Sequence, residues 1–143
     1  MIIVSTTLLS KIESHGELTY PEECCGAILG TFDASSNKKI INEVIEIDNI
    51  SNEDKKRRFM IKPEEYQRVE SYAKEKSLIL LGFYHSHPDH PATPSDTDLK
   101  FAWPFFSYLI TTVNKSQAKE TNSFVIDLES NVFKNETLTI VDK

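Results

Sequence analysis

Cysteine is scarce in this sequence of 143 residues, and the two that are present, Cys24 and Cys25, are neighbours. Adjacent thiols cannot join distant parts of a fold, so we expect both to be free thiols in a reducing compartment. Apolar runs are also short, and none approaches the ~20 residues that a membrane-spanning helix needs. The segment MIIVSTTLLSKIESHGE lacks a basic leader and a small-residue cleavage site. The sequence therefore predicts a soluble, cytoplasmic protein.

Positive charge is in deficit as well, because 16 Lys and Arg residues stand against 22 Asp and Glu residues, a net charge of −6. Binding to a phosphate backbone requires clustered cations, so a nucleic-acid partner is not expected. Residues 53–58 form a strongly charged run that we interpret as a solvated loop. Glycine-rich phosphate loops are missing too, which argues against a doubly wound nucleotide-binding fold.

The length and the apolar pattern predict one domain that spans residues 1–143 and has a single core. Strands are predicted at 2–4, 24–32, 39–47, 58–61, 78–85, 106–113, 123–128 and 132–141, and helices at 5–15, 63–76 and from 95 to near 104. The run 78–85 is continuously apolar, which is typical of a central strand buried on both faces. Strands dominate without regular alternation with helices, so we predict an α/β or α+β sandwich with a mixed sheet flanked by two or three helices.

Two histidines stand at the end of the predicted central strand. His85 and His87 are at positions i and i+2 of an extended segment, so their side chains share a face and two imidazoles can converge on one ion. Pro88 follows at once and places the pair at a rim of the sheet. Asp98 comes 11 residues after His87, in the first turn of a helix that begins at Ser95. Two imidazoles and one carboxylate leave a zinc coordination position open for water, as in catalytic zinc sites.

Each of these signals also has a simpler interpretation. Paired histidines can be ordinary surface or packing residues, and Ser95 with Asp98 has the form of a helix-capping pair. His90 is a rival third ligand, although a histidine among prolines in a loop is more often solvated. Hydrolysis by metal-bound water also needs a base, and Glu22 and Glu23 both precede the apolar segment CCGAILG. Only one of two adjacent residues can face the metal, and the pattern alone does not choose between them.

At these residues the chain resembles the JAMM metalloproteases, also called the JAB1/MPN/Mov34 domain family. The motif reads His85-Ser86-His87-Pro88, then seven residues, then Ser95 and Asp98, with Glu23-Cys24-Cys25-Gly26 upstream. The segments PEECCGAILG, RFMIKPEEY, GFYHSHPDHPATPSDTDLKFAWP and SYLI are similar to the compact bacterial members, so the resemblance extends from Glu22 to about Ile110. It implies an MPN or cytidine-deaminase-like sandwich whose sheet is largely antiparallel.

The resemblance also implies an activity, a cofactor and residue roles. One catalytic Zn²⁺ is held by His85, His87 and Asp98, while Glu23 is the general base and Ser95 helps to stabilise the tetrahedral intermediate. The family is a family of zinc peptidases and isopeptidases that cut after the glycine-ended tail of ubiquitin-like proteins. A bacterial sulfur carrier protein with a C-terminal Gly-Gly tail is the expected substrate. The alternative is a deubiquitinase-like enzyme of a bacterial ubiquitin-like modification pathway. Such a tail can add to a sheet edge beside the zinc.

Two further alternatives are an inactive MPN binding scaffold, which the complete ligand set disfavours, and a zinc deaminase, whose Pro-Cys-x-x-Cys segment is missing. Cys24 and Cys25 are interpreted as small buried residues and not as nucleophiles. Too little chain lies between Asp98 and the strand predicted at 106–113 for the long insertion of chain-selective eukaryotic deubiquitinases. The sequence does not identify the particular substrate, the bond type or the oligomeric state.

Overall fold

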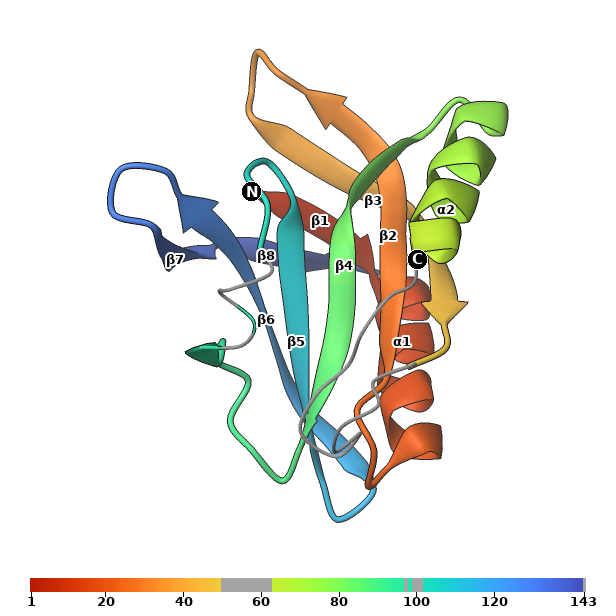
Figure 1. Ribbon diagram of the computed structural model, residues 1–143, viewed down its shortest axis with the longest axis vertical. Helices are drawn as coiled ribbons and strands as arrows, with labels where there is room; N and C mark the ends of the chain where they lie inside the picture. Colours follow the sequence, from red (N-terminus) through yellow and green to blue (C-terminus); the bar gives the residue numbers. More distant parts are fainter. Residues whose placement is uncertain (50–62, 97, 99–101, 143) are drawn as a thin grey trace.

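The computed structural model describes residues 1–49, 63–96, 98 and 102–142. Within these ranges the chain forms one eight-stranded sheet and two helices (Figure 1). The elements are β1 Ile2–Ser5, α1 Thr6–Thr19, β2 Cys25–Asp33, β3 Lys38–Ile47, α2 Pro63–Glu75, β4 Ile79–Pro88, β5 Ser107–Asn114, β6 Gln117–Asp127, β7 Val132–Glu136 and β8 Leu138–Val141. The strand order across the sheet is β7-β6-β5-β4-β2-β3-β1-β8.

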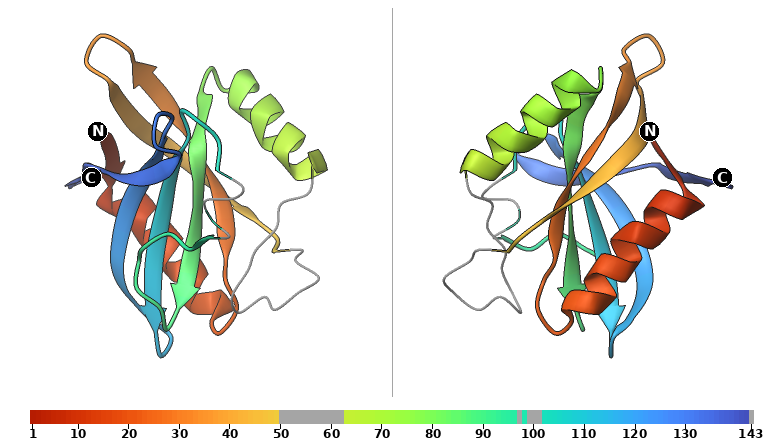
Figure 2. Two further views of the ribbon diagram at one scale, coloured as in Figure 1. Left: turned by 60° about the vertical axis from the view of Figure 1, so that its left-hand side comes forward. Right: turned by 90° about the vertical axis from the view of Figure 1, so that its right-hand side faces the viewer.

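The sheet is mixed and largely antiparallel, as the sequence and the resemblance predicted. Strand β2 runs antiparallel to β3 and β4, and β6 runs antiparallel to β5 and β7. The parallel pairs are β4 with β5 and β1 with both β3 and β8. The two helices cover opposite faces (Figure 2), because Ile12 of α1 packs with Cys24 and Tyr84, whereas Val69 of α2 packs with Cys25 and Phe83. The predicted sandwich architecture is confirmed.

Strand β4 is the central strand that the apolar run predicted. Its residues after Ile79 are all buried, and β2 and β5 flank it on either side. It continues to Pro88 instead of ending at His85, because β5 runs parallel beside it as far as Val113. Pro88 has no N–H to offer, and the ladder passes to the next residue, where the Asp89 N–H donates to the Val113 carbonyl at 2.8 Å.

Helix α1 begins where the sequence predicted and ends later. Ser5 caps it, since its hydroxyl accepts the Leu8 N–H at 3.1 Å. The helix continues through Gly16 to Thr19, and Gly16 is buried against the strands. A Cβ at Gly16 would lie 3.0 Å from Val113 Cγ2 and 3.4 Å from Ser86 Cβ. Glycine at this position therefore allows the helix to approach the sheet closely.

The single strand predicted at 132–141 is wrong, because the segment forms two strands at opposite edges of the sheet. Val132–Glu136 pairs with β6 and Leu138–Val141 pairs with β1, and only Thr137 separates them. The Thr137 carbonyl accepts the Ile2 N–H at 2.9 Å. The sheet is therefore curled so that its two edges meet at this residue (Figure 1). No glycine or proline stands within residues 132–141, so the sequence carries no turn signal at the change of partner.

Other differences concern boundaries. Strand β6 begins at Gln117, six residues before the predicted start, because pairing with β5 draws the polar segment 117–122 into the ladder. The strand predicted at 58–61 lies outside the described residues. The helix predicted from Ser95 is described only at Asp96 and Asp98, which are helical, and the described residues 102–104 are not. The lack of helix at residues 102 and 103 agrees with the restriction that a proline at 104 places on the residue before it.

A buried polar network joins strands from both halves of the curled sheet. Lys39 of β3 is 5% exposed, and its ammonium donates to the Phe105 carbonyl and, at 2.8 Å, to Ser107 Oγ. Ser107 Oγ and Ser123 Oγ donate in turn to Glu136 Oε1 at 2.6 and 2.9 Å. The network links β3, β5, β6 and β7, and so helps to close the sheet.

Removing the cation of this network is expected to destabilise the fold. Lys39→Ala leaves the Phe105 carbonyl and the Ser107 hydroxyl without their buried donor, which costs roughly 1–3 kcal/mol of unfolding free energy. Lys38→Ala, at the neighbouring and more exposed lysine, is the matched control. Chemical denaturation of both variants measures the difference, and equal unfolding free energies would show that the network contributes no net stability.

Candidate metal centre

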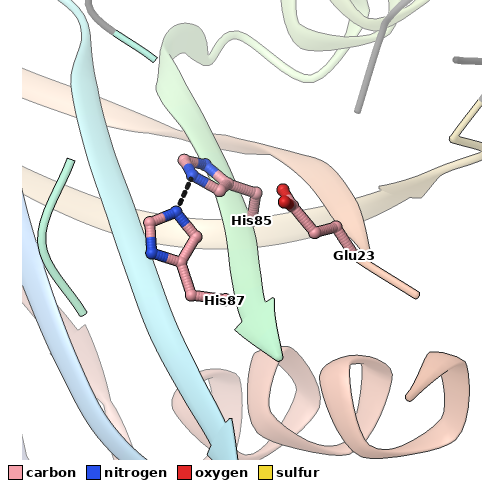
Figure 3. Close-up of side chains that lie close together, drawn as sticks. All are labelled: Glu23, His85 and His87. Atoms are coloured by element: carbon pink, nitrogen blue, oxygen red, sulfur yellow. Dashed lines mark hydrogen bonds between the residues drawn. The ribbon is translucent and has the colours of Figure 1, made fainter. Parts of the chain in front are cut away.

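The pairing register of β2 with β4 determines which glutamate reaches the histidines. Cys25 lies directly opposite His85. Because the strands are antiparallel, Glu23, two residues before Cys25, comes to lie opposite His87, two residues after His85. All four side chains share one face of the sheet. Glu22 is on the other parity and is exposed. Ligand atoms of the buried residues Glu23, His85 and His87 all lie within 4.8 Å of one another (Figure 3). The structure therefore brings Glu23 to the candidate site, where the sequence pattern alone could not choose.

The side chains of His85, His87 and Asp98 converge tightly. The two imidazole Nε2 atoms are 3.1 Å apart, His85 Nε2 is 3.2 Å from Asp98 Oδ1, and His87 Nε2 is 3.2 Å from Asp98 Oδ2. A tetrahedral zinc ion with bonds of about 2.0–2.1 Å separates its ligand atoms by about 3.3–3.4 Å. Each pair of side chains thus brings donor atoms to nearly the spacing that one zinc ion requires, with a different carboxylate oxygen of Asp98 facing each histidine. This donor set fits the metal that the resemblance implies.

The tautomer of His87 is set by a second hydrogen bond. Its Nδ1 lies 2.9 Å from the Pro91 carbonyl oxygen, which can only accept, so Nδ1 carries the proton. The Nε2 lone pair of the neutral ring then points at His85 and Asp98. A cation among these three side chains would convert the facing lone pairs into ligand bonds, and a backbone partner on the remote nitrogen is the usual support of a metal-binding histidine.

The charges in the site also suit a divalent cation. Burial opposes the ionisation of Asp98. The charge of His85 and the hydrogen bonds of His85, His87 and the Ser95 N–H outweigh burial and hold the pKa of Asp98 far below its usual range. Burial lowers the pKa of His85, against the attraction of Asp98. For His87, burial also acts downward, but hydrogen bonds to Asp98 and Pro91 prevail and raise the pKa. The carboxylate is therefore ionised, and His85 favours its neutral, metal-binding form.

Ser95 and Asp98 satisfy both interpretations that the sequence left open. The Ser95 N–H donates to Asp98 Oδ2 at 2.8 Å, and the Asp98 N–H donates to Ser95 Oγ at 3.1 Å, so the two residues form a reciprocal cap. The same Oδ2 lies 3.2 Å from His87 Nε2. The cap therefore fixes the orientation of the carboxylate toward the histidines. A role of Ser95 in stabilising an intermediate stays a prediction.

The backbone around Glu23 is anchored on both sides by residues that the sequence analysis gave no role. The Asn49 side-chain amide donates to the Glu23 carbonyl at 3.1 Å. The Cys24 N–H donates to Ser86 Oγ at 2.8 Å, and the Ser86 N–H donates to the Cys24 carbonyl at 3.2 Å. Ser86 is the spacer of the His-x-His pair and is fully buried on the opposite face. Its hydroxyl fastens the Glu23 segment to β4, a function that spacing alone could not indicate.

The rival candidates do not join the site. His90 is exposed, and its backbone carbonyl accepts the Thr112 hydroxyl. Cys24 and Cys25 are buried, as predicted; burial raises the pKa of Cys24 to about 11 and that of Cys25 further still. Protonated thiols at neutral pH are poor nucleophiles and poor metal ligands. The interpretation of both cysteines as small buried residues is consistent with this geometry.

Comparison with known proteins places these residues in a wider context. A family model described as prokaryotic homologs of the JAB domain matches residues 5–127. A desampylase from Haloferax volcanii is 32% identical over 91 residues, which cover 63% of this chain and 62% of that protein. Tail tip assembly protein K of Escherichia phage N15 is 28% identical over 90 residues, 63% of this chain and 32% of that protein. The match therefore spans less than two thirds of either curated relative.

Solved structures share the fold along the whole chain. A protein from Desulfitobacterium hafniense superposes with a TM-score of 0.86 at 24% identity, covering 100% of this chain and 94% of that one. A protein from Salinibacter ruber gives 0.76 at 31% identity, with 99% and 92% covered. A JAB1/MPN domain protein from Archaeoglobus fulgidus gives 0.61 at 19% identity, with 99% of both chains covered. Separately, the described part of the chain contains no helix that is both long and apolar enough to cross a membrane.

Proposed function

This chain belongs to the JAB domain family, in its prokaryotic branch, and from that premise we propose that it is a zinc-dependent isopeptidase or peptidase. The proposed reaction is hydrolysis of the bond that follows the C-terminal glycine tail of a ubiquitin-like protein. One observation supports it above the others: a buried carboxylate, Glu23, faces two histidines whose Nε2 atoms stand 3.1 Å apart and 3.2 Å from Asp98. A binding scaffold has no need of this arrangement.

In the proposed mechanism His85, His87 and Asp98 hold the metal. Zinc, when bound, supplies a Lewis acid that polarises the scissile carbonyl and lowers the pKa of water. Glu23 accepts a proton from the attacking water at a carboxylate oxygen and returns it to the leaving amine. Ser95 Oγ already accepts the Asp98 N–H, so its own O–H remains to donate to the developing oxyanion. The hydrogen bonds of Asn49 and Ser86 hold the Glu23 segment in place during both proton transfers.

Two substrate classes are compatible with this chemistry. The compact bacterial pattern of the sequence favours a sulfur carrier protein with a Gly-Gly tail, cut at a peptide bond or released from an attached cysteine. The relative from Haloferax volcanii is named a desampylase, which favours a deconjugating reaction on a protein-linked, ubiquitin-like modifier. Both classes present the same extended glycine tail to the site and differ in the group that leaves.

The sheet topology limits which strand the glycine tail of a substrate could pair with. Strand β4 carries the histidines and has β2 on one side and β5 on the other, so a tail cannot pair with β4 along residues 82–85. Addition to a sheet edge beside the metal therefore requires a segment other than this strand. Addition of the substrate tail to a sheet edge stays a prediction.

The proposed function can be tested with defined substrates. Zinc-loaded protein is incubated with ubiquitin-like carriers that either continue past Gly-Gly in a peptide bond or are joined through an isopeptide bond to lysine, and products are followed by intact mass. We expect cleavage directly after the terminal glycine. Faster release from the isopeptide substrate indicates deconjugation, whereas faster release of the linear extension indicates carrier processing. Failure to cut either type under zinc-loaded conditions would contradict the proposal.

A further inference from the structure

The segment 89–96, which follows β4, is held by an unusual run of side-chain contacts. Three consecutive backbone carbonyls, those of His90, Pro91 and Ala92, each accept a hydrogen bond from a different strand. The donors are the Thr112 hydroxyl from β5, His87 Nδ1 from β4 at 2.9 Å, and the Asn122 side-chain amide from β6 at 3.0 Å. Pro91 and Pro94 prevent regular secondary structure in this segment, and these side chains supply the partners that a helix or strand would otherwise provide.

Apolar packing reinforces the same segment. The Ala92 side chain is 1% exposed and lies in a small core cluster with Ile110 and Phe124. At the start of the segment, the Asp89 N–H donates to the Val113 carbonyl at 2.8 Å. The Pro91 carbonyl therefore sits between two anchored neighbours, and its position relative to His87 is fixed from β5 and β6.

This position matters because the Pro91 carbonyl determines how His87 is presented. The acceptor of the His87 Nδ1 hydrogen bond is a backbone oxygen. Replacing the Pro91 side chain therefore does not remove this hydrogen bond, and only displacement of the segment does. If the carbonyl moves, His87 loses the partner that fixes its tautomer and ring orientation. The Thr112 hydroxyl and the Asn122 amide bond the carbonyls of His90 and Ala92, on either side of the Pro91 carbonyl that orients His87.

We infer that Thr112 and Asn122 are positioning residues that set the zinc affinity of this protein through the Pro91 carbonyl and His87. The inference rests on the proposed function in that it takes zinc as the metal. It assigns metal affinity to two side chains that lie outside the His-x-His and Ser-x-x-Asp motif.

The test measures zinc dissociation constants by chelator competition for Thr112→Val, Asn122→Leu and the double variant. Each change removes a donor with little change in side-chain volume. Loss of outer-shell partners typically weakens metal binding roughly 10–100-fold, and we expect the double variant to fall in that range with smaller effects for each single variant. Thr111→Val is the matched control, because Thr111 is the adjacent residue, is 1% exposed, and bonds Thr121 Oγ1 at 2.7 Å instead of the segment.

A second readout separates this inference from the proposed function. In metal-free protein, the His87 Nδ1 proton should be visible by ¹⁵N-edited NMR in the wild type and in Thr111→Val, and should exchange rapidly in the double variant. A double variant with wild-type zinc affinity and a retained Nδ1 proton would overturn the inference, as would equal weakening by Thr111→Val. A different outcome is a wild type that binds no zinc but whose Nδ1 proton still depends on Thr112 and Asn122. That outcome would contradict the proposed function, and it would still show that Thr112 and Asn122 position His87.

Discussion

Glu23→Gln is expected to lower kcat on a glycine-tail substrate by roughly 10²–10⁴-fold, the range that a positioned general base contributes. Glutamine has nearly the same shape and can keep the place of Glu23 on the face shared with His85 and His87, but it cannot accept the proton of the attacking water. Zinc affinity should change little, because Glu23 is proposed as a base and not as one of the three ligands. Single-turnover cleavage followed by intact mass, with zinc content measured in parallel, checks both parts.

Glu22→Gln provides the control for this experiment. It removes the same charge one residue away, at an exposed side chain whose parity directs it away from the histidines. Its kcat should equal that of the wild type. Equal activities of Glu23→Gln and wild type would remove the general base from the mechanism, and loss of zinc in Glu23→Gln would instead make Glu23 a ligand.

Asp98→Asn is expected to weaken zinc binding more than the roughly 10–100-fold that outer-shell partners cost, because a charged ligand is lost. Asparagine keeps one carbonyl oxygen, which can still accept the Ser95 N–H that Asp98 Oδ2 accepts at 2.8 Å. The helix cap therefore survives while the negative charge between the two histidines disappears. The variant thus separates the capping role of this residue from its proposed role as a ligand.

Chelator competition measures the zinc affinity of Asp98→Asn, and thermal unfolding of the metal-free proteins measures the cap. Asp96→Asn is the matched control, since Asp96 is exposed and two residues away. We expect Asp96→Asn to unfold and to bind zinc as the wild type does. We expect Asp98→Asn to lose zinc affinity and, when metal-free, to lose the stability that the contacts of the Asp98 carboxylate with the two histidines supply. Wild-type affinity in Asp98→Asn would leave the capping interpretation as the sufficient account of this residue.

Much of the candidate site could be predicted from spacing. Residues i and i+2 of a strand share a face. Recognising that segment as a strand was therefore enough to predict that His85 and His87 face the same way. A serine three residues before Asp98 indicated a helix start, and the reciprocal cap is present. These predictions rest on local geometry, which the sequence determines over a few residues.

Predictions that depended on distant pairing were harder to make. The residue pattern left Glu22 and Glu23 open, and only the family resemblance selected Glu23. The physical reason for this choice is the register Cys25 opposite His85, which joins segments 60 residues apart. The division of 132–141 into β7 and β8 depends on the curl of the whole sheet, and no glycine or proline in this segment marks the change of partner at Thr137. The hydrogen bond from His87 to the Pro91 carbonyl involves a backbone atom, which every residue type has, so the residue at position 91 gives no sign of it. In each case the missing information was tertiary.

The central claim is that His85, His87 and Asp98 bind one zinc ion and leave room for water. Crystals grown with zinc and measured on both sides of the zinc absorption edge test it most directly. The account predicts one anomalous peak about 2.0–2.2 Å from His85 Nε2, His87 Nε2 and an Asp98 carboxylate oxygen, with a water as the remaining ligand. A peak bound instead by cysteine sulfur or closed by a fourth protein side chain, or no peak among these three residues, would contradict it.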